Sequence, residues 1–202
     1  MIDYLSTFIF FFAVIDPIGT IPVFIAVTNG FSRSMKREIA FKAAIVSALV
    51  LTFFVVAGEV ILTAIGIPLS AFQVAGGIVL FLFALTMIFG DGKPKSEVNS
   101  APEGGEVAIF PLAVPSIASP GAMLAAVMMT ENQEYTIIQQ GQTTLVMVSV
   151  LLIAFVLMLL AGKINDIIGN NGASIVSRVM GLILASVAVS SVLSGIKDYF
   201  AL

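Results

Sequence analysis

The chain has 202 residues, of which 59% are hydrophobic and 10% are charged, and its net charge is −3. A soluble domain carries roughly 25% charged residues, so the composition excludes an ordinary soluble core and indicates an integral membrane protein with about six spans of ~20 residues. The chain contains no cysteine and no histidine, which excludes disulfides, thiolate nucleophiles and the commonest metal ligand and proton shuttle.

The first apolar segment, residues 4–28, carries polar and helix-breaking residues in its middle. Residues 16–22 read Asp-Pro-Ile-Gly-Thr-Ile-Pro. In hydrocarbon a helix can break only where protein or a polar cavity satisfies the freed backbone groups, so we expect a discontinuous helix and a binding site. No basic stretch precedes this segment and no small-residue cleavage pattern closes it, which favours a retained span over a signal peptide.

The next two spans are continuous. A polar turn, in which Ser32 or Ser34 can cap the following helix, leads to a span over residues 43–65 with Glu59 near the interface. Gly-Ile-Pro at residues 66–68 predicts a tight turn before a third span over residues 71–89. Residues 91–106 are rich in Gly, Pro, Ser and charge, which predicts a linker.

The second half of the chain repeats the pattern of the first. Residues 107–130 form an uncharged span with three prolines, and its Ser-Pro-Gly at residues 119–121 corresponds to the Asp-Pro of the first span. A polar segment with capping-box spacing at Thr136 and Gln139 follows. Spans over residues 143–161 and 179–196, separated by a loop over residues 163–178, bring the total to six.

The halves match in three places at an offset near 104 residues. Because each half has three spans, the copies have opposite topology, as in transporters whose substrate site lies near the midplane. We therefore predict an all-α membrane protein of two inverted three-helix repeats, residues 1–90 and 107–202, with the first and fourth helices discontinuous and residues 91–106 as the linker. Chance similarity between short apolar segments is the alternative.

Eight of the nine basic residues flank the loops after the first, third and fifth spans, and only Lys197 lies on the opposite side. The positive-inside rule then places both termini outside the cytoplasm and the linker inside it. We expect a multi-pass protein of the plasma or inner membrane.

The two helix breaks predict the chemistry of the site. Asp or Ser directly before Pro is typical of a helix cap followed by the first helical residue, and half-helix N-termini bind carboxylates while freed carbonyls accept from an ammonium group. The pair suits a small zwitterion. The predicted substrate-binding residues are Asp16, Pro17, Ile18, Gly19, Thr20, Ser116, Ser119, Pro120, Gly121 and Ala122. The glycines at 76, 77 and 181 are expected to serve helix packing.

Asp16 has two interpretations. It can be a buried cap, satisfied by the backbone N–H groups of Ile18 and Gly19. Alternatively, it couples transport to a proton or cation, or binds the substrate amine, because an ionisable residue within a membrane is a functional hypothesis by default. Burial would raise its pKa and capping hydrogen bonds would lower it, so the sequence leaves both readings open.

These segments resemble the MarC family, also described as SnatA-type neutral amino acid transporters. The resemblance rests on residues 16–24, Asp-Pro-Ile-Gly-Thr-Ile-Pro-Val-Phe, and on Phe-Pro-Leu-Ala-Val-Pro at 110–115 with Ser-Pro-Gly-Ala at 119–122. Ser119 departs from the glycine that is more usual in the family. The resemblance implies six spans in inverted repeats and uptake of glycine, alanine and similar small neutral amino acids, driven by a proton gradient. Sodium is the other candidate coupling ion.

Other functions remain as alternatives. An exporter or a passive channel can share this fold. An enzyme is not expected, because an intramembrane protease needs two facing carboxylates or histidine ligands to a metal. We expect no cofactor, no metal and no nucleic acid partner, with the lipid bilayer and a small neutral amino acid as the partners. The oligomeric state is not predicted.

Overall fold

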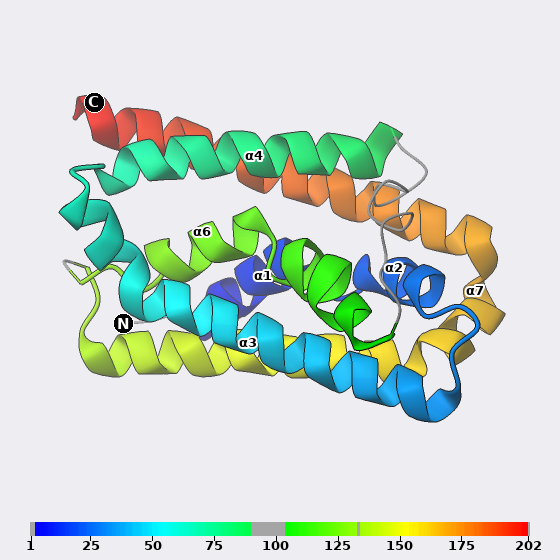
Figure 1. Cartoon of the computed structure of the whole chain (residues 1–202). Helices are drawn as coiled ribbons and strands as arrows, with labels where there is room; N and C mark the ends of the chain where they lie inside the picture. The colour runs from blue at the N-terminus through cyan, green and yellow to red at the C-terminus, as the bar shows by residue number, and fades with distance from the viewer. Residues whose placement is uncertain (1–2, 90–103, 133, 202) are drawn as a thin grey trace.

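The computed structural model describes residues 3–89, 104–132 and 134–201, and within them every regular element is a helix. Figure 1 shows long helices running lengthwise around shorter central ones. The helices are α1 (Tyr4–Ile15), α2 (Thr20–Val27), α3 (Arg33–Ala64), α4 (Leu69–Phe89), η1 (Gly104–Ala108), η2 (Ile109–Ile117), α6 (Pro120–Met128) and α7 (Ile137–Phe200). The linker predicted over residues 91–106 lies almost wholly outside the described residues.

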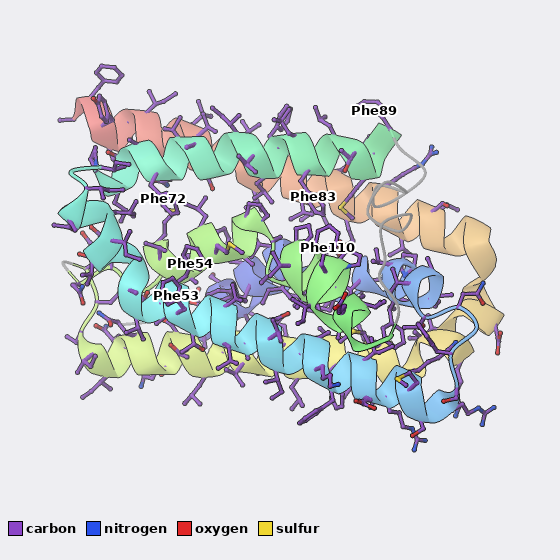
Figure 2. The ribbon with its side chains drawn as sticks, viewed as in Figure 1. Phe53, Phe54, Phe72, Phe83, Phe89 and Phe110 are labelled. Atoms are coloured by element: carbon purple, nitrogen blue, oxygen red, sulfur yellow. The ribbon has the colours of Figure 1, made fainter. Side chains whose placement is uncertain are left out.

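The described residues contain five helical segments that are long and apolar enough to cross a membrane, or six if one bent pair counts as a single span. The bent pair is Glu106–Ile117 with Pro120–Met128, whose axes differ by 59°. Large apolar side chains lie on the outside of the bundle, where Phe53 is 54% exposed and Phe89 is 81% exposed (Figure 2). A surface this apolar is suited to lipid rather than to water.

Two long helices extend beyond the predicted spans. α3 begins at Arg33 because the Ser32 hydroxyl accepts a bond from the Met35 N–H, which confirms one of the two expected caps. α7 begins with the predicted capping box between Thr136 and Gln139. Residues 163–178, expected as a loop, are helical within α7, which doubles back at one end of the molecule (Figure 1). That segment contains no proline to end a helix.

The interrupted first span is the most deeply enclosed of the five. Within its apolar window 61% of the residues are buried, against 22% in α3 and 28% in α4. The residues of α6 are also mostly buried. The two interrupted segments therefore lie largely inside the bundle, packed against the long continuous helices.

α4 packs closely against the second span of α7. A Cβ on Gly77 would lie 3.0 Å from the backbone oxygen of Ala188, and a Cβ on Gly181 would lie 3.0 Å from that of Ala84. Gly76 instead faces Leu124 of α6. The glycines thus let α4 approach two neighbours at once, which is how small residues act in membrane helix packing.

Candidate functional site

The break in the first span is built around Asp16. This residue has φ 51° and ψ 64°, a left-handed conformation that closes α1, and its N–H donates to the Phe12 carbonyl at 3.1 Å. Asp tolerates this conformation better than most residues, and the following Pro17 disfavours a right-handed helical conformation here. The sequence predicts that Asp16 starts the second half-helix directly, whereas α2 begins only at Thr20.

The side chain and carbonyl of Asp16 together hold the start of α2. Carboxylate Oδ1 accepts from the Gly19 N–H at 2.9 Å, and the Asp16 carbonyl accepts from the Thr20 N–H at 3.1 Å and the Thr20 hydroxyl at 3.0 Å. The sequence predicts that the backbone N–H groups of Ile18 and Gly19 bond to this carboxylate, and the bond from Gly19 is confirmed. Thr20 bonds to its own backbone, which is common for threonine in membrane helices.

Gly19 is required by this arrangement. A Cβ at this position would lie 2.6 Å from Cγ and 2.8 Å from Oδ1 of Asp16, distances that real Cβ atoms do not adopt. The carboxylate therefore occupies the space that a side chain at 19 would take. The absence of a side chain at 19 thus gives the Asp16 carboxylate its place.

The second break is centred on Ser119 and Pro120. Ser119 has extended φ and ψ of −70° and 160°, its hydroxyl accepts from the Ala122 N–H at 3.1 Å, and Pro120 is the first residue of α6. This is the cap and first residue expected from the Ser-Pro pair. Upstream, Phe110 and Val114 are extended within η2, each directly before a proline, as proline requires of the residue before it.

The two breaks meet in space. The Ser119 hydroxyl donates to the Val14 carbonyl at 2.8 Å. In an uninterrupted helix that carbonyl would accept from the N–H of residue 18, so the break in α1 frees it. One hydroxyl thus caps α6 and satisfies a carbonyl of α1, and it ties the halves of the chain together at their irregular points.

The predicted site residues are enclosed in this conformation. Asp16 and Ser119 are each 1% exposed, and Thr20 and Ser116 are also buried. Ile18 and Pro120 are half-buried. Gly121 faces α4, where a Cβ would lie 3.1 Å from Leu80 Cδ2, so the glycine lets α6 and α4 approach closely. Ala122 contributes the N–H that Ser119 caps.

Ser47 of α3 is a polar residue that the sequence does not single out. It is fully buried, and its hydroxyl lies 2.8 Å from the Ala43 carbonyl and 3.4 Å from the Ala113 carbonyl. The second contact reaches η2 directly before its extended residue Val114. A lone serine in an apolar stretch is the only signal that points to it.

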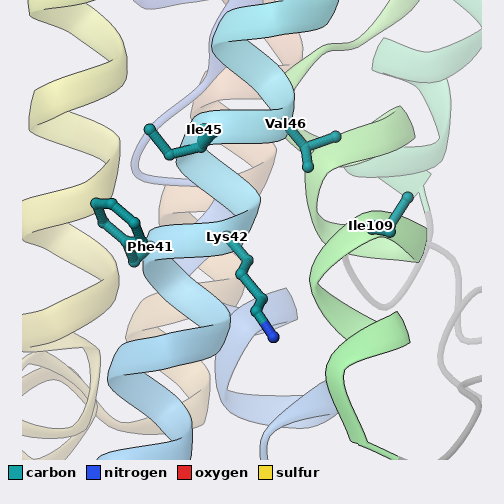
Figure 3. A pocket seen from close by; sticks show the side chains of 5 residues that line it. All are labelled: Phe41, Lys42, Ile45, Val46 and Ile109. Atoms are coloured by element: carbon teal, nitrogen blue, oxygen red, sulfur yellow. The ribbon is translucent and has the colours of Figure 1, made fainter.

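A separate hollow of about 290 Å³ lies between α3 and η2 on the outside of the bundle (Figure 3). Its lining is apolar except for Lys42, whose ammonium group pairs with Glu38 at 2.7 Å. It suits a hydrocarbon chain and lies away from the two breaks. Among the described residues no three His, Cys, Asp or Glu side chains are grouped to hold a metal.

Acidic side chains gather where α3 ends and α7 begins. Glu59 Oε2 accepts from the Asn132 N–H at 2.7 Å and joins α3 to the loop before α7. Partial burial raises the pKa of Glu131 in that loop, and the negative charges of Glu59, Glu134 and Asp198 raise it further. The basic Arg33, Lys36 and Arg37 lie at the other end of α3.

Comparison with known proteins finds a family and relatives that match nearly the whole length of the chain. The sequence profile described as MarC family integral membrane protein matches residues 1–200. The UPF0056 membrane protein MJ1677 of Methanocaldococcus jannaschii is 36% identical, with 96% of each chain covered. The UPF0056 membrane protein YvbG of Bacillus subtilis is 32% identical, covering 96% of this chain and 93% of its own. No solved structure has a significant match to the chain.

Proposed function

We propose a transport function for this chain, which belongs to the MarC family of integral membrane proteins. Its substrates are small neutral amino acids such as glycine and alanine. The observation that supports this most directly is the contact between the two breaks, where the Ser119 hydroxyl bonds to the Val14 carbonyl in the buried centre of the bundle. Paired broken helices that meet inside a membrane protein are typical of transporter sites.

The two helix starts differ in charge, and this difference orients a zwitterion. At α2 the N–H groups of Gly19 and Thr20 already bond to Asp16, whose negative charge complements the positive end of the helix. At α6 the cap is the neutral Ser119, and Gly121 occupies a position whose N–H has no acceptor within the helix. The substrate carboxylate therefore binds at α6 and its ammonium group at Asp16.

The size of the substrate follows from the residues around the second break. Ala118, Ala122, Ala125 and Ala126 are all fully buried there. Neighbours this small allow the backbones to approach closely, so a modest opening admits only a substrate with a short side chain. The packing therefore favours glycine and alanine over large neutral amino acids.

The packing of the long helices supports inverted repeats with discontinuous first and fourth helices. α3 of the first half packs against η2 and α6 of the second, while α7 of the second half packs against α1 and α2 of the first. Each half thus covers the interrupted span of the other. When one half of the chain tilts against the other half, the site opens first to one side of the membrane and then to the other.

Uptake into liposomes tests the proposal. Purified protein should take up labelled glycine or alanine saturably, and an inward proton gradient should drive accumulation above the external concentration. Uptake that stops when the internal and external substrate concentrations are equal indicates a passive channel. Loss of substrate from loaded vesicles under an outward proton gradient indicates an exporter. Absence of movement of any neutral amino acid in either direction overturns the transport function, and turnover of a substrate would make the chain an enzyme.

Asp16→Asn tests the coupling role. Asparagine tolerates the left-handed conformation and can still accept from the Gly19 N–H, so the fold should persist. If Asp16 carries the coupled proton, alanine exchange continues but accumulation driven by the proton gradient is lost. Proton-driven accumulation equal to that of the wild type would leave Asp16 as a cap alone, and replacement by a sodium gradient tests the other ion.

The charge distribution supports both termini outside the cytoplasm. Arg33, Lys36 and Arg37 begin α3 at one end, and the acidic Glu59, Glu131 and Glu134 lie at the other. Because the chain lacks native cysteine, Ser34→Cys should react with an impermeant thiol reagent only from the cytoplasm. Asn99→Cys, in the linker outside the described residues, should do the same. Labelling of either from outside in intact cells would reverse the orientation.

A further inference from the structure

A cavity of about 330 Å³ opens at the end of the bundle where the chain begins, away from the two breaks. It lies between the start of α1, the end of α6 and the start of α7. Asp3, Ser6, Thr7 and Phe10 line it from the α1 side, and Met129, Tyr135 and Thr143 line it from the other. Its volume is at the lower end of the range for small-molecule sites, which suits a compact solute.

Thr143 distinguishes this cavity from an ordinary surface hollow. Its side chain is 2% exposed and lines the cavity, yet its hydroxyl makes no hydrogen bond to any residue that the structure describes. Most buried hydroxyls have a partner, and threonines in helices usually bond to the carbonyl four residues earlier, as Thr144 does with Gln140 at 2.8 Å. A hydroxyl that lines a cavity without an acceptor among the described residues is suited to a ligand.

The rest of the lining complements a zwitterion. Asp3 caps α1 through the Leu5 and Ser6 N–H groups and accepts from the Ser6 hydroxyl at 2.6 Å, so it presents a negative charge at the mouth. These hydrogen bonds from Ser6 hold the pKa of Asp3 below its usual value. Phe10 and Met129 supply apolar surface for a short side chain.

We propose that this cavity is an outer binding site for the zwitterionic solute, on the side of the membrane that carries the termini. The ammonium group lies at Asp3 and the carboxylate accepts from the Thr143 and Tyr135 hydroxyls. This inference rests on the proposed transport function. From Phe10 to Asp16 the α1 axis rises about 9 Å, and the buried Phe11 and Val14 lie between them, so the solute reaches the breaks only after this segment moves.

A cysteine in the cavity tests the proposal in a chain that has none of its own. Thr143→Cys should react with an impermeant methanethiosulfonate reagent, and external alanine should slow that reaction several-fold. Propionate and ethylamine, which each lack one charged group, should slow it less. Glu134→Cys, exposed in the same loop but not part of the lining, should react at a rate that alanine does not change.

The outer site is overturned if saturating alanine leaves the rate of the Thr143→Cys thiol reaction unchanged. It is also overturned if neither Thr143→Cys nor Ser6→Cys reacts with the reagent. Ser6→Cys serves if the threonine variant does not fold, since Ser6 is exposed at the mouth. The readout needs no transport. If alanine protects the cysteine but is not taken up into liposomes, the outer site stands and the transport function is rejected. If alanine is taken up but does not protect the cysteine, the transport function stands and the outer site is rejected.

Discussion

The Ser119 hydroxyl lies 2.8 Å from the carbonyl oxygen of Val14, although the two residues are 105 positions apart in the chain. The same hydroxyl accepts from the Ala122 N–H at 3.1 Å. Both ends of this contact are buried, so water cannot replace either bond. A single oxygen therefore completes the last turn of α1 and the first turn of α6.

Removal of that oxygen should destabilise the bundle. Ser119→Ala loses a helix cap and leaves the buried Val14 carbonyl without its donor, at a combined cost of about 1–3 kcal/mol. Thermal unfolding in detergent should show a lower midpoint, and uptake should fall. Ser149→Ala is the control, because Ser149 is exposed and bonds only to the Val146 carbonyl. Equal midpoints for the two variants would contradict the role of Ser119.

A methyl group at residue 19 should disrupt the first break. In Gly19→Ala the new Cβ would lie 2.6 Å from Asp16 Cγ, so the carboxylate must leave its bond to the residue 19 N–H. Stability and uptake should both fall. In an Asp16→Ala background the collision disappears, so the same change should cost much less stability. A double-mutant cycle measures this coupling, and additive effects would show that Gly19 has another role.

The contact between α4 and α7 gives a prediction in which two glycine substitutions have opposite effects. Gly77→Ala places a Cβ 3.0 Å from the Ala188 oxygen, and overpacking of this kind costs about 1–3 kcal/mol. Gly141→Ala lies in α7 with nothing within 4 Å of its Cβ, so it should stabilise the helix by about 0.5–1 kcal/mol. Unfolding midpoints should move in opposite directions, and two increases would contradict the close approach.

Glu131 should make stability depend on pH. Burial, and then the charges of Glu59, Glu134 and Asp198, raise its pKa above the model-peptide value of 4.5. The folded state therefore holds this proton more tightly than the unfolded state. The stabilisation is complete below the unfolded pKa and is lost as pH rises through the raised pKa of the folded state.

Glu131→Gln removes that dependence. At neutral pH the variant should unfold at a higher temperature than the wild type, because it carries no charge to desolvate or to be repelled by its neighbours. The difference should vanish once the pH is low enough to protonate Glu131 in the wild type. Unfolding midpoints between pH 4 and pH 8 measure the effect, and parallel curves for the two proteins would refute it.

Local patterns predict much of this protein. The apolar composition places it in a membrane, residues 16–24 and 110–122 identify its family, and the Ser-Pro pair at 119–120 indicates where α6 begins. The local sequence also predicts the capping box at Thr136 and the cap at Ser32, and both are confirmed. These features depend on backbone groups within four residues of one another, so the neighbouring side chains are sufficient to determine them.

Only the tertiary structure decides how those local features are used. Asp16 closes α1 in a left-handed conformation and α2 begins only at Thr20, Gly121 packs against Leu80, and residues 163–178 continue as helix. The bond from Ser119 to Val14 and the cavity at Thr143 join segments more than 100 residues apart. Such contacts depend on how whole helices pack. The local sequence therefore predicts the two helix interruptions near Asp16 and Ser119, and packing decides that they meet.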